Sequence, residues 1–104
     1  MIVEKKDIYT YIVFFENDSQ DNLQQKIKFI ISHIDNVIVD IKSINKEKLV
    51  LSLLKYSSLW KKQNKSFILV VNDSKIDYDK EIICLPTFNE AIDYLYMEEL
   101  ERNV

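Results

Sequence analysis

The sequence predicts a single α/β domain with a mostly parallel sheet of four to five strands, an opening antiparallel hairpin and three main helices. The chain has 104 residues, the usual size of one domain with one hydrophobic core. Short segments rich in β-branched residues alternate with longer segments whose apolar residues recur at helical spacing, as in parallel-sheet folds. The composition, 47% hydrophobic and 30% charged, is typical of a folded chain.

The N-terminal half predicts a hairpin, a helix and a central strand. Residues 2–5 and 8–15 are rich in β-branched and aromatic residues, and the break at residues 6–7 predicts two antiparallel strands. Ser19 is a suitable N-cap for a helix, and the run at residues 37–39 lacks polar alternation, so it predicts a strand covered on both faces. The apolar face of the helix comprises Leu23, Ile27, Ile30, Ile31 and Ile34.

The C-terminal half continues the alternation. A long helix is expected from Asn45 to the cationic, Asn-containing end at residues 61–64, with an inward face that includes Leu49, Leu53 and Trp60. Residues 67–71 repeat the buried-strand pattern, and residues 81–85 predict a last short strand.

A capping box predicts the start of the final helix. Thr87 and Glu90 have the spacing at which each side chain satisfies a free backbone amide, so the helix should begin at Phe88. Ala91, Ile92 and Leu95 are expected to face inward. The charged residues near the C-terminus are expected to form a solvated end, namely Glu98, Glu99, Glu101 and Arg102.

Composition excludes several function classes. The chain has no glycine, and glycine-rich phosphate loops require it because a Cβ blocks close approach of the ligand. The net charge of −3, with dispersed lysines, argues against nucleic acid as a partner. The charged N-terminus lacks the features of a secretory signal, and no apolar run approaches the ~20 residues of a membrane helix. We therefore expect a cytoplasmic protein that binds no membrane.

The sequence offers no recognisable catalytic, cofactor-binding or metal-binding residues. One histidine, His33, and one cysteine, Cys84, cannot supply the three or four ligands of a zinc site. Cys84 lies in an apolar run and is interpreted as a small buried hydrophobe. The acidic residues within 73–81 lack the glycine and the spacing of a calcium loop. We expect no enzyme, with an active site shared between subunits as the remaining alternative.

Asp40 has a position typical of a binding residue. It follows the buried strand at residues 37–39, and α/β folds place binding residues at the carboxyl ends of parallel strands. The alternative is that Asp40 accepts hydrogen bonds from backbone amides of residues 42–45 and shapes the turn.

The sequence Val-Ile-Val-Asp-Ile-Lys-Ser-Ile-Asn-Lys-Glu-Lys-Leu at residues 37–49 resembles the core of STAS domains, the sulfate-transporter and anti-sigma-factor-antagonist family. That family shows an apolar strand, an Asp, a short loop and then Ile-Asp-Ser-Ser-Gly-Leu. Ile44 and Leu49 match its apolar ends, and Asn45 replaces the second Asp. Residues 87–91 are similar to the Thr-x-x-Glu-Ala of the family's last helix. The resemblance implies one STAS-like domain over residues 1–104.

Short bacterial STAS-like proteins are more closely similar. They share the Asn-Asp at residues 72–73, the Pro-Thr-x-x-Glu-Ala at residues 86–91 and the Met-Glu-Glu-x-Glu-Arg at residues 97–102. Members of this group are sometimes labelled ribonuclease Z, but that enzyme needs a histidine-rich zinc site that one histidine cannot supply.

The resemblance implies a non-enzymatic protein-interaction domain. Lys46, Glu47 and Lys48 occupy the place of the Ser-Ser-Gly in which antagonists are phosphorylated, so that switch is absent. The partner is expected to contact the loop and helix start through Asp40, Ser43, Asn45, Lys46, Glu47 and Lys48. The alternative is a homodimeric or accessory domain that stabilises a neighbouring protein through its outer strands or the helix at residues 46–62, with Tyr56 and Trp60 as anchors.

Overall fold

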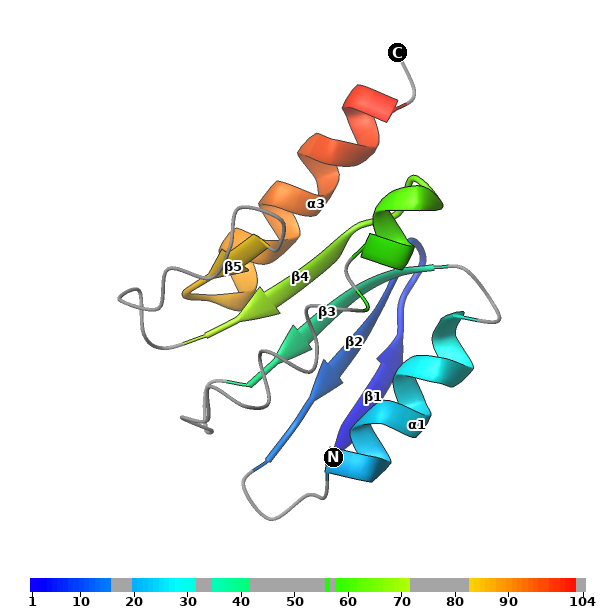
Figure 1. The fold of residues 1–104 in the computed structure, drawn as a ribbon. Coiled ribbons are helices and arrows are strands. Elements are labelled where there is room, and N and C mark those ends of the chain that lie inside the picture. The colour runs from blue at the N-terminus through cyan, green and yellow to red at the C-terminus, as the bar shows by residue number, and fades with distance from the viewer. Residues whose placement is uncertain (16–19, 32–34, 42–55, 57, 72–82, 103–104) are drawn as a thin grey trace.

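A five-stranded mixed sheet with strand order β1-β2-β3-β4-β5 forms the centre of the protein (Figure 1). The structure is a computed structural model and describes residues 1–15, 20–31, 35–41, 56, 58–71 and 83–102. β1 and β2 pair in antiparallel fashion, whereas β2, β3, β4 and β5 are mutually parallel. The strands are β1 (Ile2–Lys5), β2 (Tyr9–Val13), β3 (Asn36–Asp40), β4 (Phe67–Val70) and β5 (Ile83–Leu85). The predicted α/β class with its opening hairpin is confirmed.

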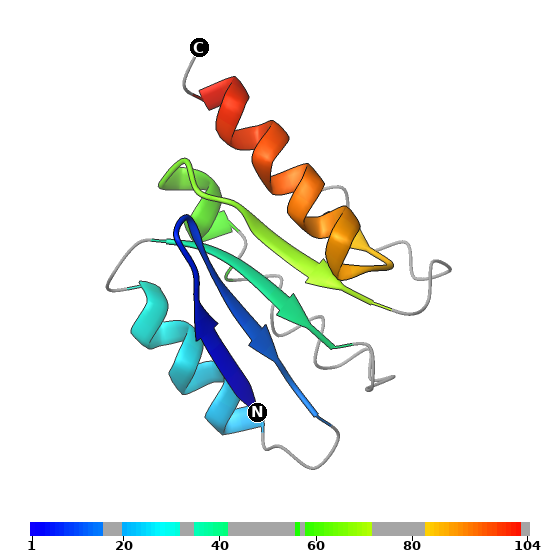
Figure 2. The same ribbon diagram turned by 180° about the vertical axis from the view of Figure 1, so that it is seen from behind.

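Helices cover both faces of the sheet. Helix α1 (Gln20–Ile31) and the helical residues 56 and 58–62 lie on one face, and α3 (Phe88–Arg102) lies on the other (Figures 1 and 2). These segments fall in the three regions where helices were predicted. No helix within the described part of the chain has the length and apolar character needed to cross a membrane.

The central strands contribute to two separate cores, because successive side chains of a strand point to opposite faces. All residues of β3 and β4 are buried, as predicted for strands covered on both sides. The core beneath α1 includes Ile12, Ile27, Val37, Val39, Trp60 and Leu69, and the core beneath α3 includes Ile38, Ile68, Val70, Ala91 and Leu95.

The second helical segment ends as its sequence predicts. Asn64 adopts a left-handed conformation with φ of 57°, which asparagine tolerates better than most residues. The Lys65 N–H donates to the Trp60 carbonyl at 3.0 Å, and the Asn64 N–H donates to the Lys61 carbonyl at 3.1 Å. This pair of bonds is a Schellman motif, which satisfies the last carbonyls of a helix.

The start of α3 at Phe88 is also confirmed. The Glu90 N–H donates to Thr87 Oγ1 at 3.2 Å, which is the first half of the predicted capping box. Ala91 and Leu95 are fully buried, and Ile92 packs against the same core. Cys84 is half-buried and packs against the α1-side core. The predictions for Ser19, His33, Asn45 and residues 73–80 fall outside the described residues.

Candidate interaction site

Asp40 lies at the carboxyl end of β3, where the sequence predicted a binding residue. Its side chain is almost completely buried, and Tyr11 on the neighbouring strand β2 donates its O–H to Asp40 Oδ2 at 2.9 Å. Phe88, the first residue of α3, packs on the Tyr11 ring with a centroid separation of 4.4 Å. This tyrosine–aspartate–phenylalanine cluster therefore connects β2, β3 and the start of α3.

The electrostatics of the cluster keep Tyr11 protonated. Burial raises the Tyr11 pKa far above its usual value, and the hydrogen bond to Asp40 and the charges of Asp40 and Glu4 raise it further. A neutral phenol can keep donating to the Asp40 carboxylate across the physiological pH range. Because Asp40 is 8% exposed, its own side chain offers little contact area.

The other predicted contact residues follow Asp40 in the sequence. Ser43, Asn45, Lys46, Glu47 and Lys48 lie outside the described residues, so the structure places Asp40 alone among the six. The alternative role predicted for Asp40, bonding to amides of residues 42–45, involves the same segment.

A second cluster of polar side chains, at the opposite edge of the sheet, was missed by the sequence analysis. This polar network consists of Asn36, Ser66, Glu98, Glu99 and Arg102. Asn36, which is 1% exposed, accepts a hydrogen bond from the Ser66 N–H at 2.7 Å and donates to Glu99 Oε1 at 2.8 Å. Arg102 donates to Ser66 Oγ at 2.8 Å and to Glu99 Oε1 at 3.0 Å. Ser66 Oγ in turn donates to Glu98 Oε1 at 2.8 Å.

The network corrects the prediction that α3 has a solvated end. The side chains of Glu98, Glu99 and Arg102 are only about a quarter exposed, and they bind the starts of β3 and β4. Glu101 is exposed, as predicted. Two signals were present, because Asn36 and Ser66 each directly precede an apolar run, and a buried polar residue needs a partner.

Charge and hydrogen bonding within the network hold Glu99 in its ionised form. The hydrogen bond from Asn36 lowers the Glu99 pKa most, burial opposes it, and the charges of Arg102 and Lys65 lower the pKa further. A stable carboxylate at this position keeps accepting hydrogen bonds from Asn36 and Arg102.

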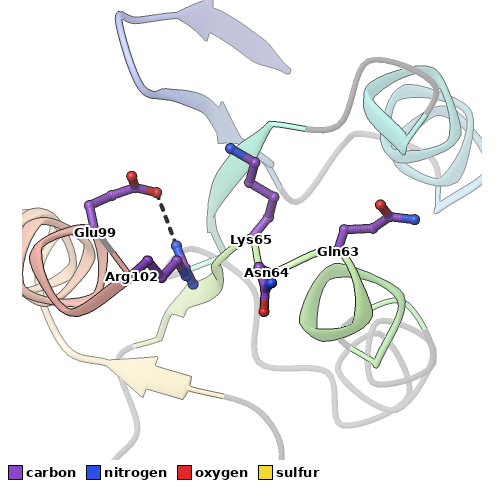
Figure 3. A pocket seen from close by; sticks show the side chains of 5 residues that line it. All are labelled: Gln63, Asn64, Lys65, Glu99 and Arg102. Carbon is purple, nitrogen blue, oxygen red and sulfur yellow. Dashed lines mark hydrogen bonds and ion pairs between the residues drawn. The ribbon is translucent and has the colours of Figure 1, made fainter. Parts of the chain in front are cut away.

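An open pocket of about 530 Å³ lies beside the network and is lined by Gln63, Asn64, Lys65, Glu99 and Arg102. Figure 3 shows Glu99 and Arg102 on α3 facing Lys65 across this pocket, with the Glu99–Arg102 pair drawn as a dashed line. Arg102 already donates to Ser66 and Glu99, so its guanidinium is committed to holding α3 against the sheet. We therefore interpret the network as a structural feature that fixes the end of α3 against the sheet.

The anchors suggested for the alternative function are not on the surface. Tyr56 and Trp60 are buried in the α1-side core, and Trp60 Nε1 donates to the Asp35 carbonyl at 2.7 Å. Trp60 also packs edge-on against Phe67 at 5.2 Å. The prediction that these two rings anchor a partner was wrong, because exposing them would open the core.

No His, Cys, Asp and Glu side chains among the described residues form a group of three or more that could hold a metal ion. No protein-family model matches the chain, and comparison with curated proteins finds no significant match.

Proposed function

We propose that this chain is a STAS-like protein-interaction domain that works without catalysis, and that its partner docks at the carboxyl edge of the sheet. The observation that carries the proposal is the Tyr11–Asp40–Phe88 cluster. It fixes two parallel strands and the start of α3 to one another, at the edge where α/β folds place binding residues.

The residues after Asp40 provide the proposed contact. Asp40 is buried, and the resemblance to STAS cores assigns the contact to Ser43, Asn45, Lys46, Glu47 and Lys48. Lys46 and Lys48 are local cations in a chain of net charge −3, so they favour an acidic patch on the partner. Since lysine and glutamate replace the phosphorylated serines of the family, docking is not switched by phosphorylation at residues 46–48.

A charge reversal tests this surface. The variant Lys46→Glu with Lys48→Glu is compared with Lys61→Glu with Lys62→Glu, whose native lysines are exposed near the end of the same predicted helix. Each variant is used to capture proteins from cell extract, and captured proteins are quantified by mass spectrometry. We expect the first variant to lose proteins that the wild type and the control variant retain. Its melting temperature should hardly change, because exposed substitutions usually shift stability by about 0.5 kcal/mol or less.

Equal capture by the wild type and Lys46→Glu with Lys48→Glu would reject the proposed surface. A second variant, Leu49→Ala, separates folding from docking, because the sequence predicts that Leu49 faces inward, and truncating a leucine in a core costs about 2–5 kcal/mol and lowers the melting temperature. Loss of capture only in this destabilised variant would likewise count against a charge-mediated contact.

Self-association through β1 is a second candidate function. β1 is an edge strand of the sheet, and all four of its residues are exposed, including Ile2 and Val3. Exposed apolar edge strands can pair with another chain, and a charge on the edge prevents this pairing. Sedimentation of the wild type as a dimer, with a monomeric Val3→Lys variant, would favour this function.

A further inference from the structure

The backbone hydrogen-bonding groups of β1 alternate between β2 and the outer side of the sheet. The Lys6 N–H donates to the Tyr9 carbonyl at 2.8 Å, so these two residues form a hydrogen-bonded pair beside the hairpin turn. In an antiparallel ladder every second residue is paired in this way, so the even-numbered residues of β1 bond to β2. The N–H and C=O groups of Val3 and Lys5 therefore point away from β2. Among the described strands, none pairs with this side of β1, which is an edge of the sheet.

The side chains of β1 are divided between the two faces of the sheet. Val3 pairs with Ile12, whose side chain lies in the α1-side core, so Val3 and Lys5 point to the α1 side. Ile2 and Glu4 point to the α3 side. All four residues of the strand are exposed, and Val3 is 43% exposed. The edge therefore offers free backbone groups together with apolar side chains at one end and charged side chains at the other.

A second copy of β1 can pair with this edge in only a few registers. Two identical strands that pair in antiparallel fashion are related by a two-fold axis perpendicular to the sheet, which keeps every side chain on its own face. The hydrogen-bonded pairs must also use the outward groups of Val3 and Lys5. Within β1, these pairs are Val3 with Val3 of the second copy, Val3 with Lys5, and Lys5 with Lys5.

Charge favours the first of these three registers. The Val3–Lys5 register places the Glu4 side chains of the two copies directly opposite each other, at a pair where the strands approach most closely. The Lys5–Lys5 register places two lysines opposite each other. The Val3–Val3 register instead brings two exposed β-branched side chains together and places Glu4 opposite Ile2, so it opposes no like charges directly.

We infer that β1 pairs with β1 of a second copy in the antiparallel register centred on Val3, so that two five-stranded sheets join into one continuous sheet. This inference rests on the second candidate function, self-association through β1, and specifies its geometry. The assembly closes as a dimer, because both copies use the same edge. The strand has four residues, so the contact is smaller than a standard interface, and we expect a dissociation constant in the micromolar range or weaker.

Opposite charges at residue 3 test the register. Val3→Lys and Val3→Glu are each studied by sedimentation over a range of protein concentrations, and circular dichroism checks that both are folded. Each variant alone should be a monomer, because the introduced charge faces its own copy. An equimolar mixture should restore the dimer, because the introduced cation and anion then lie opposite each other. As controls, Leu59→Lys and Leu59→Glu, changed at a residue that is 43% exposed on the second helical segment, should each dimerise as the wild type does.

Single-cysteine variants report the register independently, because a residue of a symmetric dimer cross-links to its own copy only where the two lie opposite. Cys84→Ala removes the single native thiol, and Val3→Cys, Glu4→Cys, Lys5→Cys or Leu59→Cys then adds one. Under mild oxidation Val3→Cys should form a disulfide-linked dimer at least about tenfold faster than Leu59→Cys, since paired strands raise the effective concentration of the thiol. Hydrogen-bonded antiparallel pairs have Cα atoms about 5.5 Å apart, within disulfide range. Glu4→Cys and Lys5→Cys, which report the other two registers, should cross-link more slowly than Val3→Cys.

The outcomes separate the register from self-association itself. The register is wrong, but association through β1 stands, if Val3→Glu strengthens the dimer by facing Lys5 and if Glu4→Cys cross-links fastest. Both the register and the second candidate function are rejected if the wild type stays monomeric and Val3→Cys cross-links no faster than Leu59→Cys. Both are also rejected if the wild type forms a dimer that neither charge at residue 3 weakens.

Discussion

Replacing Asn36 by alanine should strongly destabilise the protein, because four hydrogen bonds converge on this one buried amide. Its Oδ1 accepts from the Ser66 N–H at 2.7 Å and from Arg102 at 3.4 Å. Its Nδ2 donates to the Ile8 carbonyl and to Glu99 Oε1, each at 2.8 Å. The alanine side chain can replace none of these bonds.

The magnitude follows from the groups left without a partner. A buried polar group without its hydrogen bond costs about 1–3 kcal/mol, and Asn36→Ala leaves the Ser66 N–H and the Ile8 carbonyl in that state. We therefore expect a loss of about 3 kcal/mol in the free energy of unfolding. For a domain of this size, that corresponds to a fall in melting temperature of about 10–20 °C.

Thermal unfolding followed by circular dichroism measures the effect, with Asn89→Ala as the control. Asn89 is exposed on the first turn of α3, so its removal should change stability by about 0.5 kcal/mol or less. NMR titration provides a second readout, since loss of the Asn36 donor should raise the pKa of Glu99.

The pH dependence has a definite sign. A carboxyl group with a lowered pKa stabilises the fold above its unfolded-state value of about 4.3, and this contribution is lost as the pH falls through the folded-state pKa. Glu99 has a lower pKa in the wild type than is expected in Asn36→Ala, so the wild type should lose more stability in acid. The difference in melting temperature between the two proteins should therefore shrink as the pH falls. Equal melting temperatures for the Asn36 and Asn89 variants, or an unchanged Glu99 pKa, would refute the reasoning.

Three further predictions concern single residues. Because the folded state favours protonated Tyr11, the wild type should lose stability more steeply than Tyr11→Phe as pH rises above about 10. Denaturant midpoints that fall equally with pH in the two proteins would contradict this. Asn64→Ala should cost about 1 kcal/mol in urea unfolding and Asn64→Gly almost nothing, since glycine adopts positive φ without penalty, so equal losses would argue against the left-handed conformation. Burial raises the Cys84 pKa to about 11, so at pH 8 iodoacetamide should modify the folded protein more slowly than the unfolded chain, and equal rates by mass spectrometry would count against its burial.

The sheet was predictable because its signals are local. The apolar residues of β3 and β4 are continuous in sequence, and that pattern by itself indicates burial on both faces. The end of the second helical segment at Asn64 and the start of α3 after Thr87 also depend on a few neighbouring residues. These features need no knowledge of how distant elements pack.

The polar network was not predictable in the same way, because its partners are far apart in sequence. Ser66 and Asn36 are 30 residues apart, and Arg102 is 66 residues from Asn36. Their meeting depends on the direction in which α3 crosses β3 and β4. The sequence did indicate that Trp60 faces inward, and this inward orientation is incompatible with the anchoring role also suggested for it.

For Asp40, the position in the fold was predictable from the sequence, but the hydrogen-bond partner was not. Its position at the end of a buried parallel strand could be read from the sequence, because the preceding residues form an apolar run. Its bond to Tyr11 could not, since this requires the parallel register in which Tyr11 pairs with Ile38 and Val13 pairs with Asp40. The register brings Tyr11 diagonally across from Asp40, on the side that α3 covers.

The two polar clusters have a shared consequence for α3, because they hold opposite ends of the same helix. Phe88 packs on Tyr11 at the start of α3, and Arg102 binds Ser66 at its end. Fully satisfied polar networks fix the position of an element even where their net contribution to stability is small.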